Sequence, residues 1–254
     1  MTRDAHAREI IDSGYTVFEQ AWSPAEVRRL RAMIVERFEA EPNLPEQLWT
    51  TKDYQINDSV SMAYTGVVIY SMVRDRPEIA ELLFKPEIIA SLREVLGSDM
   101  AIEVVGAVVT DETRPFFAWH THIGGYDDGD IQSSGKWPTV TSADRITTLL
   151  YLDDIDDEGG MLLVYPREVR DPTAPIGDPH SEWDGQIEVP VRKGSLVAME
   201  QCTWHTARPM KREGLRVFLG VNYRSRRIPA PDWADETLAA GVPHSPLLGE
   251  LLGG

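Results

Sequence analysis

The chain of 254 residues is 42% hydrophobic and carries a formal net charge of −16 at pH 7. This length and composition predict one folded domain, residues 1–254, with a sizeable core, and they exclude a fibrous or low-complexity protein. The negative charge argues against a nucleic-acid partner, because phosphate backbones attract basic surfaces.

The cysteine content and the apolar stretches bear on where the protein works. Cys202 is the only cysteine, so no intramolecular disulfide can form; we interpret it as a buried small residue in a reducing cytoplasm. The N-terminal MTRDAHAREI lacks an apolar run of signal-peptide length, and later apolar stretches are too short to cross a bilayer. We therefore expect a cytoplasmic protein without a membrane partner, as a monomer or homodimer.

The N-terminal part, residues 1–100, is predicted to be mostly helical. The segment SPAEVRRLRAMIVERFEA begins with Ser23 as an N-cap and has Glu26 placed to complete a capping box, and its apolar residues recur at helical spacing. A second helix is predicted at KPEIIASLREVLG, residues 85–97, with a proline near its start and a glycine as its stop. Between these helices, residues 41–75 are predicted to be irregular.

Strand patterns begin at residue 101. Short apolar runs are separated by Gly, Pro and Asp, in the order AIEVVGAVVT, RITTLLYL, GMLLVY, QIEVP, GSLVAM and LRVFLGVNY. Six such runs after a helical start favour a mainly β fold, a jelly-roll sandwich or barrel with helices on one outer face. We place the jelly-roll core at residues 101–228 and a C-terminal tail at residues 229–254.

The last predicted strand indicates how its sheet is oriented. Alternate residues form two faces, an apolar one suited to burial beneath helices and one suited to a polar interior. The apolar face holds Leu215, Val217, Leu219 and Val221, and the other holds Arg216, Phe218, Gly220 and Asn222. Arg216 is therefore expected to point into the barrel, where an isolated charge is costly without an anionic partner.

Basic residues are concentrated near this strand in an otherwise acidic chain. The cluster is a candidate site for a small anion, although we interpret most of its members as a solvated basic surface. Its members are Arg208, Lys211, Arg212, Arg216, Arg224, Arg226 and Arg227.

Two histidines one residue apart form the most specific pattern, in AWHTHIGGYDDGD. On an extended segment, side chains at i and i+2 share a face, so His120 and His122 can point toward one ion. Imidazole is a good ligand for iron, zinc and copper. His205, in CTWHTARP directly before the last long strand, is the natural third ligand. The other histidines lie in predicted termini or loops and are poor candidates: His6, His180 and His244.

The quoted motifs together resemble those of a known family. In their order along the chain, GYTVFEQAWSPAEVRRLRAMIVERF, FFAWHTHIGG, LLYLDDIDDEGGMLLVYP and GSLVAMEQCTWHTARPMKREGLRVFLGVNY resemble the phytanoyl-CoA dioxygenase-like branch of the iron(II)/2-oxoglutarate-dependent oxygenases. The resemblance covers nearly the whole chain, with four individually loose motifs in register. It implies a double-stranded β-helix, a cupin-like jelly-roll barrel packed against N-terminal helices.

The resemblance also implies cofactors and residue roles. His120 and His205 match iron ligands, and Arg216 matches the arginine that pairs with the distal carboxylate of 2-oxoglutarate. Iron(II) and O₂ are the other implied cofactors, and the co-substrate is converted to succinate while a substrate C–H bond is oxidised. Thr147 is a candidate for assisting the co-substrate carboxylate, provided that it faces the interior of the barrel.

One position departs from the family pattern, because His122 stands where the H-x-D motif has a carboxylate. We favour a three-histidine site of His120, His122 and His205, which has one negative charge fewer than the usual site. Two alternatives stay open. In one, His122 turns away and leaves a two-histidine iron; in the other, the following loop supplies a carboxylate from Asp127, Asp128 or Asp130.

Tryptophans and a long loop flank these motifs. Trp119 and Trp204 directly precede proposed ligands, so on a strand they face the opposite way, toward the core. Trp137 and Trp183 are the candidates for a pocket wall. The loop at residues 167–185, rich in Pro, Asp and Gly, is expected near the pocket mouth, where it would help to set substrate choice.

Together these patterns predict an enzyme that oxidises a small molecule, with hydroxylation of a C–H bond as the default reaction and natural-product metabolism as the favoured setting. One rival is a three-histidine dioxygenase that binds its substrate directly to iron and uses no 2-oxoglutarate. The other is a catalytically silent binding or partner subunit that keeps the fold, with His122 marking the loss of activity.

Overall fold

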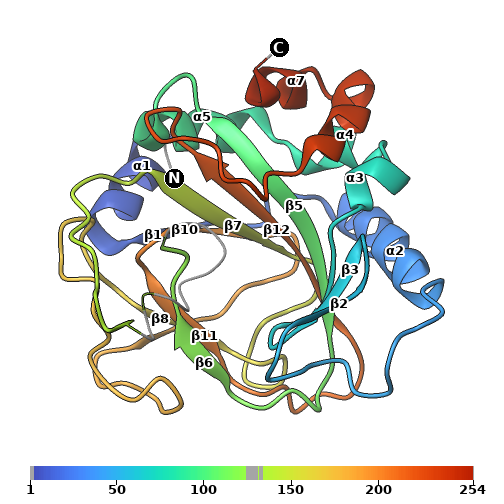
Figure 1. Ribbon diagram of the computed structural model, residues 1–254, viewed down its shortest axis with the longest axis horizontal. Coiled ribbons are helices and arrows are strands. Elements are labelled where there is room, and N and C mark those ends of the chain that lie inside the picture. The colour runs from blue at the N-terminus through green and yellow to red at the C-terminus, as the bar shows by residue number, and fades with distance from the viewer. Residues whose placement is uncertain (1–2, 124–130, 132–133, 254) are drawn as a thin grey trace.

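The structure, a computed structural model, describes residues 3–123, 131 and 134–253. Two antiparallel sheets face each other, and the helices gather on the outer side of the larger sheet (Figure 1). This is the predicted mainly β architecture of the jelly-roll type with flanking helices. Among the described residues no strand is hydrogen-bonded into both sheets, so the jelly roll is open and does not form a closed barrel.

The large sheet has eight strands in the order β1-β10-β7-β12-β5-β4-β3-β2. In chain order they are β1 (Tyr15–Phe18), β2 (Tyr54–Asn57), β3 (Val60–Ala63), β4 (Gly66–Ile69), β5 (Ala101–Thr110), β7 (Arg145–Tyr151), β10 (Leu196–Glu200) and β12 (Arg216–Arg224). Strand β12 is central, because β5 flanks it on one side and β7 on the other.

The small sheet has four strands in the order β6-β11-β8-β9. In chain order they are β6 (Phe117–His120), β8 (Leu162–Tyr165), β9 (Ile187–Val189) and β11 (Trp204–Ala207). All six predicted strand segments are therefore strands: four of them lie in the large sheet, and the other two, β8 and β9, lie in the small sheet.

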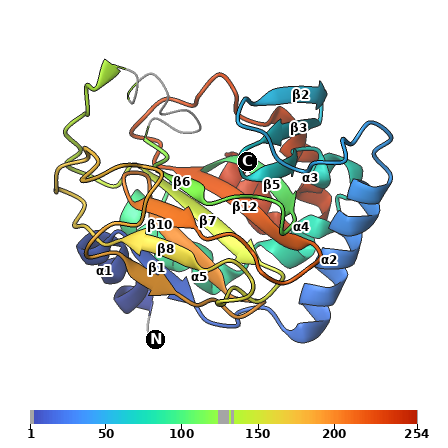
Figure 2. The same ribbon diagram turned by 90° about the horizontal axis from the view of Figure 1, so that it is seen from below.

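The helices pack on the outer face of the large sheet. They are α1 (Arg3–Ser13), α2 (Pro24–Glu39), α3 (Met72–Asp75), α4 (Ile79–Leu83), α5 (Pro86–Leu96), α7 (Pro246–Leu252) and the 3₁₀ helix η1 (Glu236–His244). Figure 2 shows α1 and α2 on opposite sides of the molecule. The predicted capping box is present at the start of α2, where Ser23 and Glu26 each accept a hydrogen bond from the other's backbone N–H.

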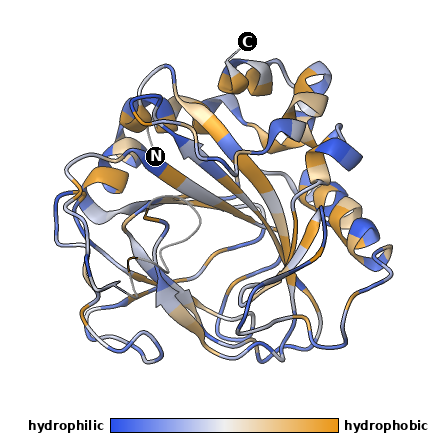
Figure 3. Ribbon diagram, in the orientation of Figure 1, coloured by the Kyte–Doolittle hydropathy of each residue, from blue (hydrophilic) through white to orange (hydrophobic). Residues whose placement is uncertain are grey.

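The large core lies between the helices and the sheet. The stripe of α2 that the sequence predicted, from Val27 to Phe38, packs here against the outer face of the sheet. That face supplies Val217, Leu219 and Val221 from β12, as their alternation predicted. Figure 3 shows apolar residues along the central strands and polar residues on the surrounding loops.

Two segments differ from their predicted form. Residues 41–75 contain β2, β3, β4 and α3 and extend the large sheet at one edge. The C-terminal residues 229–254 include η1 and α7, and α7 buries Leu248 and Leu251 in the large core. Both segments have short elements with few alternating or helical repeats, so their local patterns are weak.

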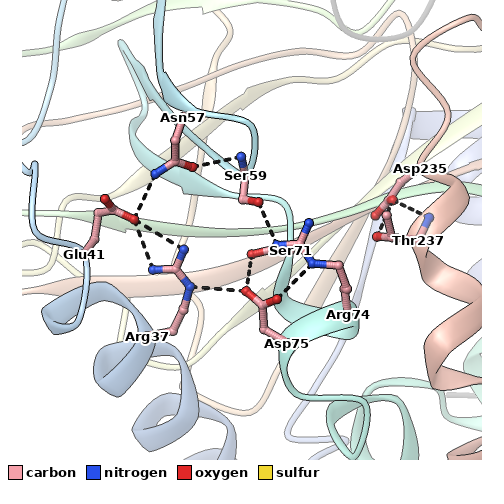
Figure 4. Close-up of polar contacts among 9 residues, drawn as sticks. All are labelled: Arg37, Glu41, Asn57, Ser59, Ser71, Arg74, Asp75, Asp235 and Thr237. Atoms are coloured by element: carbon pink, nitrogen blue, oxygen red, sulfur yellow. Dashed lines mark hydrogen bonds and ion pairs between the residues drawn. The ribbon is translucent and has the colours of Figure 1, made fainter.

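A polar network fixes the β2–β3 hairpin to the helices (Figure 4). Arg37, near the end of α2, contacts the carboxylates of Glu41 and Asp75 at 3.3 Å. The side-chain amide of Asn57 donates to Glu41 at 3.1 Å, and Arg74 of α3 donates to the hydroxyl of Ser59 at 2.8 Å. These contacts thereby tie the β2–β3 edge of the large sheet to α2 and α3.

Among the described residues, no helix is both long and apolar enough to span a membrane.

Candidate metal centre

Three histidines converge between the sheets. His120 ends β6 and lies directly across from His205 on β11, so the ladder of the small sheet sets their spacing. His122 follows two residues after β6, and its backbone N–H donates to the carbonyl of Gln201 at 2.8 Å. One ligand atom from each ring lies within 4.8 Å of those of the other two.

Backbone hydrogen bonds orient two of the rings. Nδ1 of His120 lies 3.1 Å from the carbonyl oxygen of Ala118, and Nδ1 of His205 lies 3.0 Å from that of Thr203. A carbonyl oxygen only accepts, so each Nδ1 carries the proton and each Nε2 keeps a free lone pair. This is the arrangement in which histidines bind metals.

Burial holds the pKa of all three imidazoles far below the ordinary value of 6.5. For His120 and His122 the pKa falls to about 3, mainly through burial and secondarily through a neighbouring histidine. Burial, followed by the proximity of His120, also places the pKa of His205 well below 6.5. The rings are therefore neutral at neutral pH, as metal ligation requires.

The donor set fits one first-row metal ion. Nε2 of His122 lies only 3.2 Å from Nε2 of His205, and their rings are nearly parallel. This separation matches that of two neighbouring ligand atoms on an ion with metal–nitrogen bonds of about 2.0–2.1 Å. His122 faces the same point as the other two and does not turn away. The alternative carboxylates, Asp127, Asp128 and Asp130, lie outside the described residues.

Among the described residues, these three histidines form the one group of three or more His, Cys, Asp or Glu side chains arranged for a metal. His6, which the sequence set aside, is instead buried at 2.8 Å from the hydroxyl of Thr16. Cys202 is fully buried, as expected, and burial raises the pKa of its thiol far above the usual range. A thiolate is therefore disfavoured there.

Arg216, the first residue of β12, points between the sheets as predicted, and is 5% exposed. One Nη donates to the carbonyl of Gly160 at 3.2 Å, while Nε is buried and has no partner in the described part of the chain. The nearby carboxylate of Asp153 is paired with Arg31 at 2.9 Å. A buried guanidinium without a carboxylate partner among the described residues fits an anionic ligand, since the free charge is costly.

Gly160 makes room for this arginine. Its φ is +83°, and a Cβ there would lie 3.0 Å from an Nη of Arg216 and 2.8 Å from the carbonyl oxygen of Arg208. A larger residue would therefore be strained and would press on the guanidinium. The glycine in the EGG segment of the sequence thus has a structural reason that the sequence did not reveal.

A second buried arginine, Arg114, was not singled out by the sequence. It is 1% exposed, its Nη atoms donate to the carbonyls of Pro115 and Arg208, and its Nε lacks a partner. Burial, followed by the positive charge of Arg216, lowers its pKa to about 9. In sequence it lies in a polar turn, DETRP, which gives no sign of burial. Two neighbouring buried cations strengthen the preference for an anion.

A cavity of about 300 Å³ joins these groups. All three histidines and Arg216 line it, together with the inward residues of β4, β5, β7 and β12. Most of the lining is apolar or aromatic, as in small-molecule sites. Thr147 belongs to this wall, beside Leu149 and Tyr151 on β7, so it meets the condition that it face the interior.

The predicted pocket wall of Trp137 and Trp183 is wrong. Both pack on the outer face of the small sheet, where Trp183 stacks on Trp119 with 4.5 Å between ring centroids. The loop at residues 167–185 runs along the same face, where the backbone N–H of Trp119 donates to the carbonyl of Pro179 in this loop. The loop contributes no residue to the cavity. It covers the apolar surface formed by the tryptophans on the other side of the small sheet, where their burial is favourable.

Three of the seven members of the basic cluster at residues 208–227 form surface ion pairs. Arg208 pairs with Glu182 and Glu188 at 2.6 Å, and both Arg212 with Asp156 and Arg227 with Asp144 pair at 3.1 Å. Arg216 is the member that lines the cavity, which makes it the candidate of this cluster for binding a small anion.

Comparisons with known proteins agree with this architecture. The model of the phytanoyl-CoA dioxygenase family matches residues 11–218. No curated protein sequence matches the chain significantly.

Several solved structures share the fold. A non-heme α-ketoglutarate-dependent carbocyclase, SnoK, from nogalamycin biosynthesis is 20% identical with a TM-score of 0.63, covering 89% of this chain and 86% of that one. HygX from Streptomyces hygroscopicus, with nickel and 2-oxoglutarate bound, is 15% identical with a TM-score of 0.61, covering 89% and 88%. The epimerase SnoN from nogalamycin biosynthesis is 16% identical with a TM-score of 0.60, covering 88% and 80%.

Proposed function

We propose that this chain, which belongs to the phytanoyl-CoA dioxygenase family, is an iron(II)- and 2-oxoglutarate-dependent oxygenase that hydroxylates a C–H bond of a small molecule. The family uses iron(II), 2-oxoglutarate and O₂. The observation that carries the proposal is one cavity lined both by three converging neutral imidazoles and by a buried arginine without a carboxylate partner among the described residues.

The residues divide into metal ligands and an anion site. His120, His122 and His205 hold the metal through Nε2, with the backbone carbonyls on Nδ1 fixing two of the rings. Arg216 binds the distal carboxylate of 2-oxoglutarate, and its planar fork suits a two-point contact. Thr147, on the cavity wall, assists the co-substrate carboxylate nearer the metal.

Arg114 adds a second buried positive charge near Arg216. Its guanidinium lies over the ring of Phe117, 5.6 Å from the centroid, and its Nη atoms hold two backbone carbonyls. Its positive charge adds to that of Arg216 in a region of low dielectric, where such charges act strongly. The pair therefore favours a dianionic co-substrate over a neutral one.

The bound metal and oxo acid supply O₂ activation and the oxidant for the C–H bond. The protein's own task is to orient the two substrates and to exclude water. The apolar surface, which makes up most of the exposed lining, performs the second task.

Natural-product metabolism is the setting that we propose. The similar structures include a carbocyclase and an epimerase from nogalamycin biosynthesis, which perform different reactions on a shared fold. Hydroxylation is the simplest outcome for this chain because it needs no group beyond a positioned C–H bond.

His122 supports a second candidate function. A neutral imidazole in place of a carboxylate leaves the metal site one negative charge short, which favours an anionic substrate bound directly to the metal. This candidate is a three-histidine dioxygenase that needs no 2-oxoglutarate. A silent binding subunit would keep the fold but retain neither metal nor oxo acid.

An anaerobic titration separates these functions. Iron(II) and then 2-oxoglutarate are added to metal-free protein while the visible charge-transfer band of the chelate is recorded, with His122→Asp and His122→Ala in parallel. A band in the wild type supports the proposal. Iron binding without a band indicates the dioxygenase that needs no oxo acid, and no iron binding indicates the silent subunit.

A further inference from the structure

Two glycines, Gly106 and Gly220, form a part of the cavity wall that carries no side chains and is called the floor below. Gly220 of β12 lies directly opposite Gly106 of β5, and both residues line the cavity. On the other side, Gly220 is opposite Leu149 of β7. At the centre of the large sheet, the cavity is thus lined by the backbone of β5 and β12 at the two glycines and by the side chain of Leu149 on β7.

Gly220 is open to the cavity in an otherwise buried strand. It is the one residue of β12 that is not buried, and its neighbour Leu149 is likewise only partly buried within β7. Gly220 and the three metal-site histidines line the same cavity.

The backbone does not require glycine at this point. Neither Gly106 nor Gly220 has a positive φ. A Cβ on Gly220 would meet its closest neighbours, the carbonyl oxygen of Gly106 and Cδ2 of Leu149, at 3.7 and 3.8 Å, which is ordinary contact. Glycine in a central strand lowers stability, so a position that accepts a Cβ would be more stable with one. The remaining reason for glycine is close approach of a ligand to the backbone.

Aromatic rings line the same cavity as these glycines. Phe117 lies 4.4 Å from His120 and 5.3 Å from Tyr64 between ring centroids, and Tyr151 lies 5.5 Å from Phe218. All four aromatic residues line the cavity. A bare, flat floor beside aromatic walls accommodates the face of a ring better than a branched or puckered group.

The co-substrate occupies a different part of the strand. Arg216 is four residues from Gly220, and four strand residues span roughly 13 Å. A five-carbon dicarboxylate held at Arg216 is too short to cover both that arginine and the glycine floor.

We propose that Gly106 and Gly220 form the substrate floor and select a planar, mainly apolar ring, an inference that rests on the proposed function for the identity of the reacting centre. The glycines are specificity-determining residues: they keep the floor low enough for a ring to lie on the sheet within reach of the metal site.

The test uses two alcohols with the same carbon skeleton, planar 2-naphthol and puckered decahydro-2-naphthol. Their binding to the full-length protein is measured by calorimetry for the wild type, Gly220→Ala and Gly220→Val. Gly249→Ala, on helix α7 and outside the cavity lining, is the control because it also adds a Cβ to a glycine, there in closer contact, at 3.3 Å from Val242. Thermal midpoints and the anaerobic iron–2-oxoglutarate band are recorded for every variant.

We expect 2-naphthol to bind the wild type at least tenfold more tightly than its saturated counterpart. Gly220→Val weakens 2-naphthol binding at least tenfold, Gly220→Ala weakens it less, and Gly249→Ala leaves it unchanged. Both Gly220 variants keep or raise the thermal midpoint, which a purely structural glycine would not allow. The iron–2-oxoglutarate band is unchanged.

Three results would overturn the inference: equal binding of the two alcohols, or no binding of either, by the wild type; unaltered 2-naphthol binding in Gly220→Val; or loss of the iron–2-oxoglutarate band in that variant, which would assign the floor to the co-substrate. A wild type that lacks the band but binds 2-naphthol in a Gly220-dependent way would reject the proposed function and support the floor.

Discussion

The two faces of β12 show how one strand serves stability on one side and chemistry on the other. Its outward residues, Val217, Leu219 and Val221, are at most 2% exposed and pack beneath the helices. Its inward residues line the cavity: Arg216, Phe218, Gly220 and Asn222. The three outward side chains are apolar, whereas the inward face contains a glycine and a cation without a carboxylate partner among the described residues, each of which lowers stability.

The comparison implies that substitutions on the two faces have opposite signatures. Outward changes should affect the free energy of unfolding and leave ligand affinity unaltered. Changes at Arg216 and Gly220 should affect ligand affinity with little loss of stability, because neither residue belongs to a hydrophobic cluster, whereas the inward Phe218 does.

The largest expected effect is the loss of a metal ligand, on or next to the small sheet that faces β12. Replacing His205 or His122 by alanine removes a metal ligand, so iron(II) affinity should fall by roughly a thousandfold or more, given that loss of an outer-shell partner alone costs ten- to a hundredfold. His122→Asp should retain iron. Iron content after equilibrium dialysis measures both. Unaltered iron affinity in His122→Ala would support the two-histidine alternative.

Leu219→Ala sharpens the outward half of the comparison. The side chain is fully buried in the large core, so its truncation should lower the free energy of unfolding by roughly 3 kcal/mol. Urea unfolding measures this change. The same variant should bind 2-oxoglutarate as the wild type does; a large loss of that affinity would mean that the two faces are coupled.

Arg216→Ala tests the inward half. Loss of a two-point charged contact should weaken 2-oxoglutarate binding by about a hundredfold, or about 2.7 kcal/mol, while stability is retained or rises because a buried cation is removed. The iron–2-oxoglutarate band, titrated anaerobically, gives the affinity. If dependence on the oxo acid is the same in Arg216→Ala and the wild type, the role of Arg216 is wrong.

The smallest effect concerns pH and the metal-free protein. The pKa of His205 is far below 6.5 in the folded state, so acidification protonates it only after unfolding, and stability falls as the pH drops below 6.5. Between pH 7.5 and 5.5 the wild type should lose about 1.4 kcal/mol more than His205→Gln. Urea unfolding at both pH values measures the difference. Equal losses would mean that His205 titrates normally.

Much of the fold was predictable because long segments carry strong periodic patterns. The capping box at Ser23 and the ten-residue strand Ala101–Thr110 appear where the sequence places them. The alternation in β12 even identified the buried and cavity-facing sides. Short strands with few repeats were missed, as in residues 54–69. Hydrogen bonding of β2, β3 and β4 to one another, and of β4 to β5, stabilises them, and their local sequence does not.

The site was predictable to the extent that its residues have unusual chemistry. Histidines at i and i+2, and an arginine among apolar strand residues, can be recognised in the sequence alone. Arg114 was missed because a turn gives no indication of burial, and Trp183 was assigned to the wrong side because a loop has no periodicity to indicate its face.

The sequence by itself determined the two-faced strands, the helix starts and the candidate ligand set, because these depend on residue type and on spacing along the chain. Only the tertiary structure decided that His122 faces His205 at 3.2 Å, that Arg114 is buried near Arg216, and that Gly106 and Gly220 meet across two strands. Each of these depends on register and packing between distant segments, which local patterns do not encode.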